Sequence, residues 1–135
     1  MFNDAILPTK ADPGSAGYDL YSPIDAIVYP SSMVFIQSGF AVQIPDGFFG
    51  AIYARSGLST KHHIRLANGV GVIDSSYRGQ VGLPMYNDGD TPYLIHKGDR
   101  IAQLIIQPYL EYEVCEVDHL PDTARGTGGF GSTGV

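Results

Sequence analysis

Residues 70–86 read Val-Gly-Val-Ile-Asp-Ser-Ser-Tyr-Arg-Gly-Gln-Val-Gly-Leu-Pro-Met-Tyr, and this stretch decides the fold class. A short apolar run is followed by a turn of small and polar residues and then by a second run. In the second run Val81, Leu83 and Met85 occupy alternate positions, which is typical of a half-buried strand. The stretch therefore predicts two strands joined by a turn. Pro84 cannot donate a backbone hydrogen bond, so we expect an edge or a bulge there.

The same pattern continues on both sides of this stretch. Short apolar runs separated by Gly, Pro, Asn, Asp and Ser predict further strands at residues 24–29, 33–37, 40–44, 48–54, 91–96 and 101–106. The last run is nearly all apolar, so we expect both of its faces to be covered. A short helical turn fits only around residues 56–63. Strands at this spacing predict an all-β sandwich or barrel.

Composition and charge exclude several classes of protein. The chain has 135 residues, enough for one domain with a real core, and charged residues are only 16% of it. Its net charge of −6 argues against a general nucleic-acid surface, and no apolar run is long enough to cross a membrane. We expect the lone cysteine, Cys115, to be a small buried apolar residue. With no visible secretory signal, we expect a cytoplasmic or other reducing intracellular compartment, for which viral and organellar sources are both compatible.

Several basic residues stand beside Gly, Ser or Thr, as in Arg55-Ser56-Gly57 and in the tail that begins at Arg125. Small residues allow backbone N–H groups to surround an anion, and guanidinium groups bind its oxygens. Asp74, at the end of an apolar run, is compatible with a general base or with a simple Asx turn. The glycine-rich tail, residues 125–135, is by composition alone a disordered segment.

Five segments together resemble the trimeric dUTPase family, in the order in which that family carries them. They are Ala16-Gly17-Tyr18-Asp19-Leu20, Ala54-Arg55-Ser56-Gly57-Leu58, the stretch from Asn68 to Gly79, Gly98-Asp99-Arg100-Ile101-Ala102-Gln103-Leu104-Ile105, and Arg125-Gly126-Thr127-Gly128-Gly129-Phe130-Gly131-Ser132-Thr133-Gly134. The match runs from about Pro8 to the end of the chain. Each segment alone is weak, but five in order are specific.

The resemblance implies a fold and an assembly. The fold would be a distorted jelly-roll β-barrel over residues 1–124, with residues 125–135 as a flexible arm that closes over an active site. The chain would form a homotrimer whose three active sites are shared between subunits. It would hydrolyse dUTP to dUMP and pyrophosphate by attack of water on the α-phosphorus, with no nucleic acid and no membrane as partner.

The resemblance also assigns roles to residues. Asp74 would be the general base, with Gln103 beside the α-phosphate and Arg125 on the γ-phosphate as further catalytic groups. The substrate-binding set would comprise Arg55, Ser56, Gly57, Asn68, Gly71, Val72, Ile73, Asp74, Tyr77, Gly82, Gln103, Arg125, Phe130, Gly131, Ser132 and Thr133. One Mg²⁺ would be held mainly by the triphosphate, with Asp19 reaching it through water.

Within that set, the hairpin from Asn68 to Gly82 would read the uracil edge through its backbone, and Tyr77 would exclude a 2′-hydroxyl group. Three other functions are compatible with such a fold. A dCTP deaminase is disfavoured because the uracil-reading hairpin matches the hydrolase better. A regulatory or binding protein is disfavoured because the catalytic set is complete. A structural jelly-roll subunit would leave the tail motif unexplained.

Overall fold

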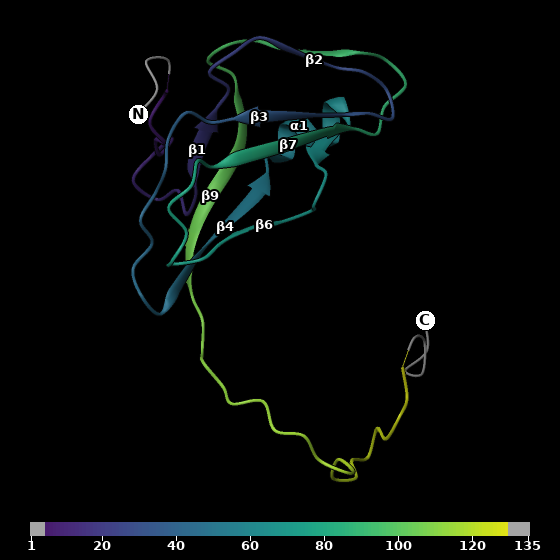
Figure 1. The fold of residues 1–135 in the computed structure, drawn as a ribbon. Coiled ribbons are helices and arrows are strands. Elements are labelled where there is room, and N and C mark those ends of the chain that lie inside the picture. The colour runs from purple at the N-terminus through teal and green to yellow at the C-terminus, as the bar shows by residue number, and fades with distance from the viewer. Residues whose placement is uncertain (1–4, 130–135) are drawn as a thin grey trace.

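The computed structural model describes residues 5–129. Over this range the chain forms nine strands and one helix (Figure 1). In chain order they are β1 (Tyr18–Tyr21), β2 (Ala26–Val28), β3 (Met33–Gln37), β4 (Phe48–Ala54), α1 (Ser56–His62), β5 (Ile64–Leu66), β6 (Gly71–Ile73), β7 (Gly82–Asn87), β8 (Tyr93–Ile95) and β9 (Arg100–Pro108). The prediction of an all-β protein with one short helical segment is confirmed.

The strands form three antiparallel sheets, which pair segments that are distant in the sequence. The largest has the order β1-β9-β4-β6, the second pairs β2 with β8, and the third has the order β3-β7-β5. β4 lies between β9 and β6 because its seven residues pair with β9 along its whole length and with β6 over Gly50–Ile52. β6 is therefore an edge strand of the described sheet.

Pro84 lies in the middle strand of its sheet, so the prediction of an edge or a bulge is wrong. β7 pairs with β3 on one side and with β5 on the other. The proline stands just past the end of β5, where its carbonyl accepts a hydrogen bond from Ala67 N–H at 2.7 Å. The donor that Pro84 lacks is replaced by the Arg65 guanidinium, whose Nη1 lies 3.4 Å from the Ala67 carbonyl oxygen. A side chain thus supplies the missing ladder contact.

Residues 40–44 do not form the expected strand. Phe40 and Ile44 are buried and Ala41 and Gln43 are exposed, so the alternation is real. Only Val81 N–H bonds to the segment in ladder fashion, through the Phe40 carbonyl. Two short strands, β1 and β5, were not predicted.

The core lies between the sheets and is formed by the side chains on one face of most strands. Its largest fully buried apolar side chains are Leu20, Val28, Ile36, Ile44, Ile64, Leu66, Val81, Leu83, Met85, Ile95 and Ile101. The alternation predicted for residues 81–85 is confirmed, since β7 buries every second residue. Of the run at 101–106, Ile101, Ala102 and Leu104 are buried but Ile106 is exposed, so only its first part is covered.

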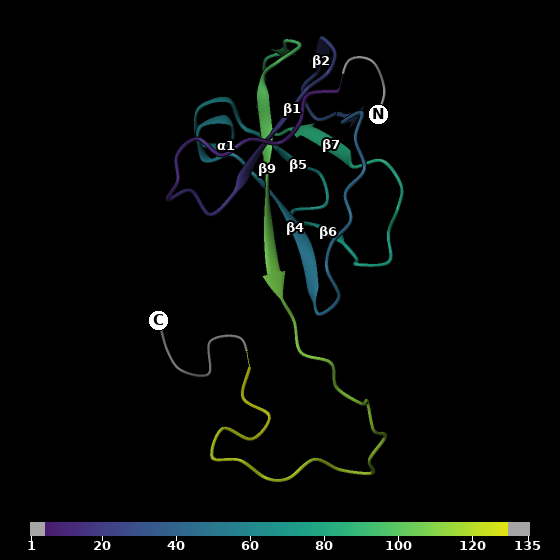
Figure 2. The ribbon, with the colours of Figure 1, turned by 90° about the vertical axis from the view of Figure 1, so that its left-hand side faces the viewer.

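After β9 the chain leaves the body, as Figures 1 and 2 show. Residues 109–129, here called the C-terminal extension, form no strand, and they carry exposed apolar side chains such as Leu110, Tyr112 and Val114. Cys115 lies on this extension and is exposed, so the prediction of a buried cysteine is wrong. Among residues 5–129, no helix is long and apolar enough to span a membrane.

Candidate functional site

A pocket of about 240 Å³ lies against β6 and the turn that follows it. We call it the hairpin pocket. It is lined by Phe35, Gln37, Ile52, Asn68, Gly71, Val72, Ile73, Asp74, Tyr77, Gln80, Val81 and Gly82. All of the predicted base-reading residues that the sequence places between 68 and 82 are in this set. The structure therefore brings this part of the predicted site together.

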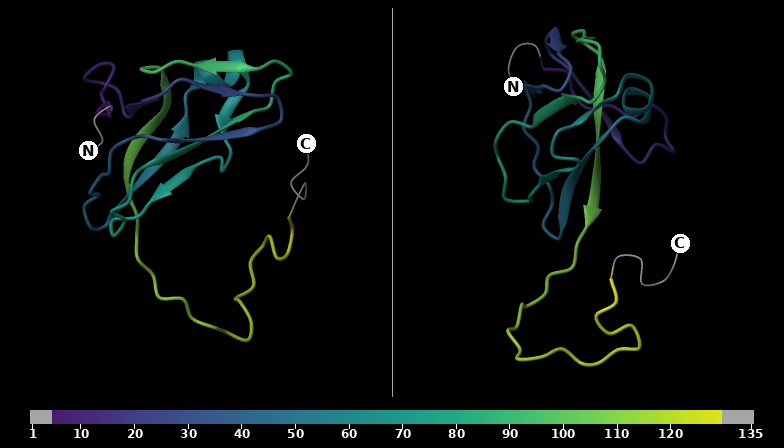
Figure 3. Two further views of the ribbon diagram at one scale, coloured as in Figure 1. Left: turned by 45° about the horizontal axis from the view of Figure 1, so that its top comes forward. Right: turned by 90° about the vertical axis from the view of Figure 1, so that its right-hand side faces the viewer.

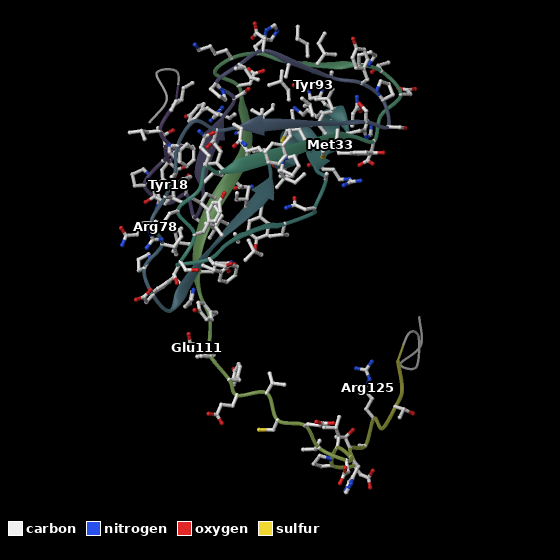
Figure 4. All side chains as sticks on the ribbon, viewed as in Figure 1. Tyr18, Met33, Arg78, Tyr93, Glu111 and Arg125 are labelled. Atoms are coloured by element: carbon white, nitrogen blue, oxygen red, sulfur yellow. The ribbon has the colours of Figure 1, made fainter. Side chains whose placement is uncertain are left out.

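The turn between β6 and β7 is braced by its own side chains. Tyr77 N–H donates to the Asp74 carbonyl at 3.1 Å, and the Tyr77 hydroxyl donates to the Gln80 carbonyl at 2.9 Å. Arg78, labelled in Figure 4, donates through Nη1 to the carbonyls of Ser75 and Tyr77. These bonds hold the turn and the Tyr77 side chain, which lines the pocket. The Asp74 side chain remains exposed at the pocket lining, where a carboxylate can meet water.

Two glycines set the shape of the hairpin pocket. A Cβ on Gly82 would overlap the ring of Phe35, and all three nearest atoms belong to that ring. A Cβ on Gly71 would lie 3.2 Å from Cβ of Ile52. Phe35 was not predicted as a site residue, because in the sequence it is an ordinary strand position. The feature that could have identified it is an aromatic side chain on the outward side of β3, where Phe35 is 53% exposed.

A second pocket of about 390 Å³ collects the residues of the first, second and fourth motifs. We call it the Asp19 pocket; it is lined by Ala11, Ser15, Gly17, Asp19, Arg55, Ser56, Gly57 and Gln103. The predicted residues Arg55, Ser56, Gly57 and Gln103 therefore lie together. They meet because β1, β4 and β9 are neighbours and α1 begins directly after β4.

Asp19 organises this pocket by holding two arginines. Its side chain is only 11% exposed, and its two oxygens accept from Arg55 Nε at 3.0 Å and from Arg100 Nη1 at 3.1 Å. Arg55 also donates through Nη1 to the Arg100 carbonyl at 3.3 Å. A guanidinium has five N–H donors, so these bonds leave donors of both arginines for an anion.

The side-chain amide of Gln103 is anchored to the backbone of β4. Its amide Nε2 donates to the Ala54 carbonyl at 3.1 Å. A Cβ on Gly17 would lie 2.9 Å from its Oε1, so a side chain there would force the Gln103 amide to shift. This explains the glycine of the first motif, which the sequence did not identify as a site residue.

The two pockets lie on different parts of the sheet, the hairpin pocket against Ile52 and β6 and the Asp19 pocket at Arg55, directly after β4. Asp74 follows Ile73, which pairs with Gly50, whereas Gln103 pairs with Tyr53 on the other side of β4. Four residues along the sheet and two strand spacings across it separate Asp74 from Gln103 by about 16 Å. Figure 3 gives two further views of the ribbon that carries both pockets. Asp74 and Gln103 of the same chain are therefore too far apart to act on the same phosphorus atom.

The tail residues of the predicted site are only partly described. Arg125 lies on the C-terminal extension, away from the body of strands in Figure 4, and its Nε donates to the Gly128 carbonyl at 2.9 Å. Phe130, Gly131, Ser132 and Thr133 lie outside the described residues. Among residues 5–129, no group of three or more His, Cys, Asp or Glu side chains is placed to hold a metal ion.

The chain is all-β. It has a small pocket against an edge strand, whose shape depends on two glycines, and a separate pocket lined by arginines. These features are typical of a protein that binds a phosphorylated ligand. The dUTPase family model matches residues 3–134. The chain belongs to the dUTPase family.

Relatives from several kinds of organism share most of the chain. It is 46% identical over 132 residues to the deoxyuridine 5′-triphosphate nucleotidohydrolase of Desulfitobacterium hafniense, covering 96% of this chain and 87% of that protein. It is 47% identical over 131 residues to the Arabidopsis thaliana protein of the same name, covering 97% and 78%. The human mitochondrial protein is 45% identical over 130 residues, covering 96% of this chain and 51% of the human protein.

Solved structures agree with the fold. The dUTPase of Staphylococcus bacteriophage 80alpha with dUPNHPP has a TM-score of 0.91 and 31% identity, covering 98% of this chain and 94% of that one. A mutant dUTPase of phage phi11, described for its coordination of a structural Mg(II) ion, has a TM-score of 0.79 and 28% identity, covering 87% and 92%.

Proposed function

We infer that this chain is a dUTP diphosphatase, which hydrolyses dUTP to dUMP and inorganic pyrophosphate. Family membership and the names of relatives at about 45% identity support this activity. The observation that carries the chemistry is the position of Asp74. Its carboxylate lines the same pocket as the backbone of β6 and the Tyr77 ring.

Asp74 acts as the general base. A carboxylate beside the pocket can accept a proton from a water molecule as that water attacks the α-phosphorus in line with the leaving pyrophosphate. The bond from the water oxygen to the α-phosphorus forms, and the bond from that phosphorus to the bridging oxygen breaks. Most of the acceleration then comes from positioning and from positive charge around the phosphates.

Uracil is read by the backbone of β6. The outer edge of this strand is unpaired among the described elements, so its N–H and C=O groups are available to a base edge as they would be to another strand. Asn68 adds a side-chain amide. The Phe35 and Tyr77 rings narrow the pocket against larger bases and sugars, and a cytosine would leave polar groups of the pocket unpaired.

The complete active site is shared between copies of the chain in a homotrimer with a jelly-roll barrel as its subunit. The separation of about 16 Å between Asp74 and Gln103 supports this assembly. Groups that act on one phosphorus must lie within hydrogen-bond reach of it. The hairpin pocket of one copy would therefore meet the Asp19 pocket of another. Arg125, Phe130 and residues 131–133 would come from a C-terminal arm and cover the γ-phosphate and the base.

Magnesium fits this site as an ion carried by the triphosphate. Both oxygens of Asp19 accept from arginines, so the carboxylate is placed to order water rather than to coordinate a metal directly. When bound, Mg²⁺ would neutralise part of the triphosphate charge. The arginines Arg55 and Arg125 supply the remaining positive charge from the chain itself.

The test is release of pyrophosphate from dUTP, with dTTP, dCTP and UTP assayed beside it, first in Mg²⁺ and then in EDTA. We expect turnover of dUTP alone and loss of turnover in EDTA. Ammonia release from dCTP would instead identify a deaminase. A folded protein that releases no pyrophosphate from dUTP would be a binding or regulatory protein with the dUTPase fold.

A further inference from the structure

A third pocket, of about 330 Å³, lies on the other side of Arg55 from the Asp19 pocket. We call it the Lys61 pocket, after the lysine at its rim. Its polar lining comes from Arg55, Lys61, His62, Tyr93, Asp99 and Arg100. Arg55 and Gly57 line both this pocket and the Asp19 pocket, so the two are neighbours at the start of α1. None of the motif roles assigned above uses Lys61, His62 or Tyr93.

Positive charge is concentrated in this pocket. The whole chain has eight Lys and Arg residues and a net charge of −6, yet three of the eight line the Lys61 pocket. Lys61 makes no ion pair with any residue that the structure describes. Arg55 and Arg100 share the carboxylate of Asp19, and Asp99 in the lining accepts from His96 N–H at 2.8 Å. Three cations therefore face two carboxylates, which leaves an excess of one positive charge. A local excess of cations in an acidic protein attracts a small polyanion.

The wall of the pocket is held in place independently of any ligand. The rings of His62 and Tyr93 pack against each other, with centroids 4.9 Å apart and planes tilted by 46°. Burial, followed by the charge of Asp99, raises the pKa of the Tyr93 phenol. Tyr93, labelled in Figure 4, comes from β8, whereas Lys61 and His62 come from the last turn of α1. Because two elements build it, the pocket is a feature of the tertiary fold.

We propose that the Lys61 pocket is a second anion subsite, which takes inorganic pyrophosphate after it leaves the α-phosphorus. The proposal rests on the proposed role of the Asp19 pocket in holding the phosphate chain. Arg55 belongs to both pockets, so a condensed phosphate can pass from one to the other while it stays in contact with one guanidinium. Arg100 and Lys61 then supply the further charges that a trianion or tetraanion requires.

The experiment follows dUMP formation by chromatography at fixed free Mg²⁺ while inorganic pyrophosphate is added. Lys61→Gln is compared with the original chain. We expect Lys61→Gln to raise the inhibition constant for pyrophosphate about three- to tenfold, with kcat and KM for dUTP changed less than twofold. Lys61→Arg keeps the charge and should keep the original inhibition constant. Lys97→Gln removes the same charge from a side chain outside the pocket, so it should also leave inhibition unchanged.

Two results would overturn the proposal. The first is an unchanged inhibition constant in Lys61→Gln; the second is a KM for dUTP that rises by the same factor, which would place Lys61 in the substrate site. Calorimetry with pyrophosphate and no dUTP separates this proposal from the proposed function. Pyrophosphate binding that weakens in Lys61→Gln supports the subsite even if dUTP is not hydrolysed. No measurable binding to the original chain rejects the subsite even if dUTP is hydrolysed.

Discussion

The hairpin pocket and the Asp19 pocket are built by different means. The hairpin pocket depends on backbone and on missing side-chain volume, since an extra carbon on Gly82 would overlap Phe35. The Asp19 pocket depends on charge, since one nearly buried carboxylate holds two guanidiniums. A pocket shaped by backbone discriminates by shape, whereas a pocket of cations attracts any phosphate chain. We therefore expect base selectivity to depend on the first and general phosphate affinity on the second.

The largest effect should come from the carboxylate itself. Asp74→Asn keeps the shape of the side chain but removes the proton acceptor, so kcat for dUTP should fall about 10²- to 10⁴-fold. Pyrophosphate release measures this loss. Asp90→Asn, in the exposed turn before β8, is the matched control and should keep full activity. An Asp74→Asn variant that retains most of its activity would remove Asp74 from the role of base.

Deletion of residues 125–135 should come next. Without Arg125 and Phe130 the γ-phosphate loses a charged donor and the base loses its cover, so kcat/KM should fall about 10²-fold. Size-exclusion chromatography with light scattering should still show a folded trimer. Deletion of Val135 alone leaves the tail motif intact and serves as the control. Full activity after the longer deletion would reject the proposed role of the arm.

Gly82 and Phe35 offer a test of the shape-based pocket. Gly82→Ala should push the Phe35 ring into the pocket and raise KM for dUTP about tenfold. The double variant Phe35→Ala/Gly82→Ala should recover most of this loss, because the three atoms nearest to the added carbon all belong to this ring. The cycle of two single variants and the double variant measures the coupling. A double variant as impaired as Gly82→Ala would show that the ring is not the obstacle.

Much of the fold follows from alternation in the sequence. The bounds of β3 and β4 agree with the predicted runs, because each of these strands is long enough to show its pattern and ends at a clear turn. Pro84 could not be placed from sequence. Its tolerance in a middle strand depends on Arg65, a residue distant in the chain that reaches the Ala67 carbonyl. Cys115 was misplaced for a related reason, since an apolar composition does not reveal that the chain has left the body.

In the candidate site, too, some residues could be predicted from the sequence and others could not. Motif residues 55–57 and 68–77 were predicted because they are unusual in kind or order, and the structure collects them in two pockets. Gly17 and Phe35 were missed because their importance depends on what they face. Gly17 gives room to the Gln103 amide, and Phe35 limits the space above Gly82. Neither relation is visible until β1 lies beside β9 and β3 beside β7.

The smallest expected effect distinguishes the two pockets most directly. Asp19→Asn removes the charge that holds Arg55 and Arg100 but keeps a side chain of the same shape. Because both guanidiniums are partly exposed, we expect a loss of stability of only about 1 kcal/mol, measured by urea unfolding. KM for dUTP should rise about three- to fivefold, whereas the preference for dUTP over dTTP should stay unchanged. Gly82→Ala should instead alter that preference, since it changes the space around the base. If Asp19→Asn altered base preference as much as Gly82→Ala does, the two pockets would not be separate determinants, and the assignment of charge to one and shape to the other would be wrong.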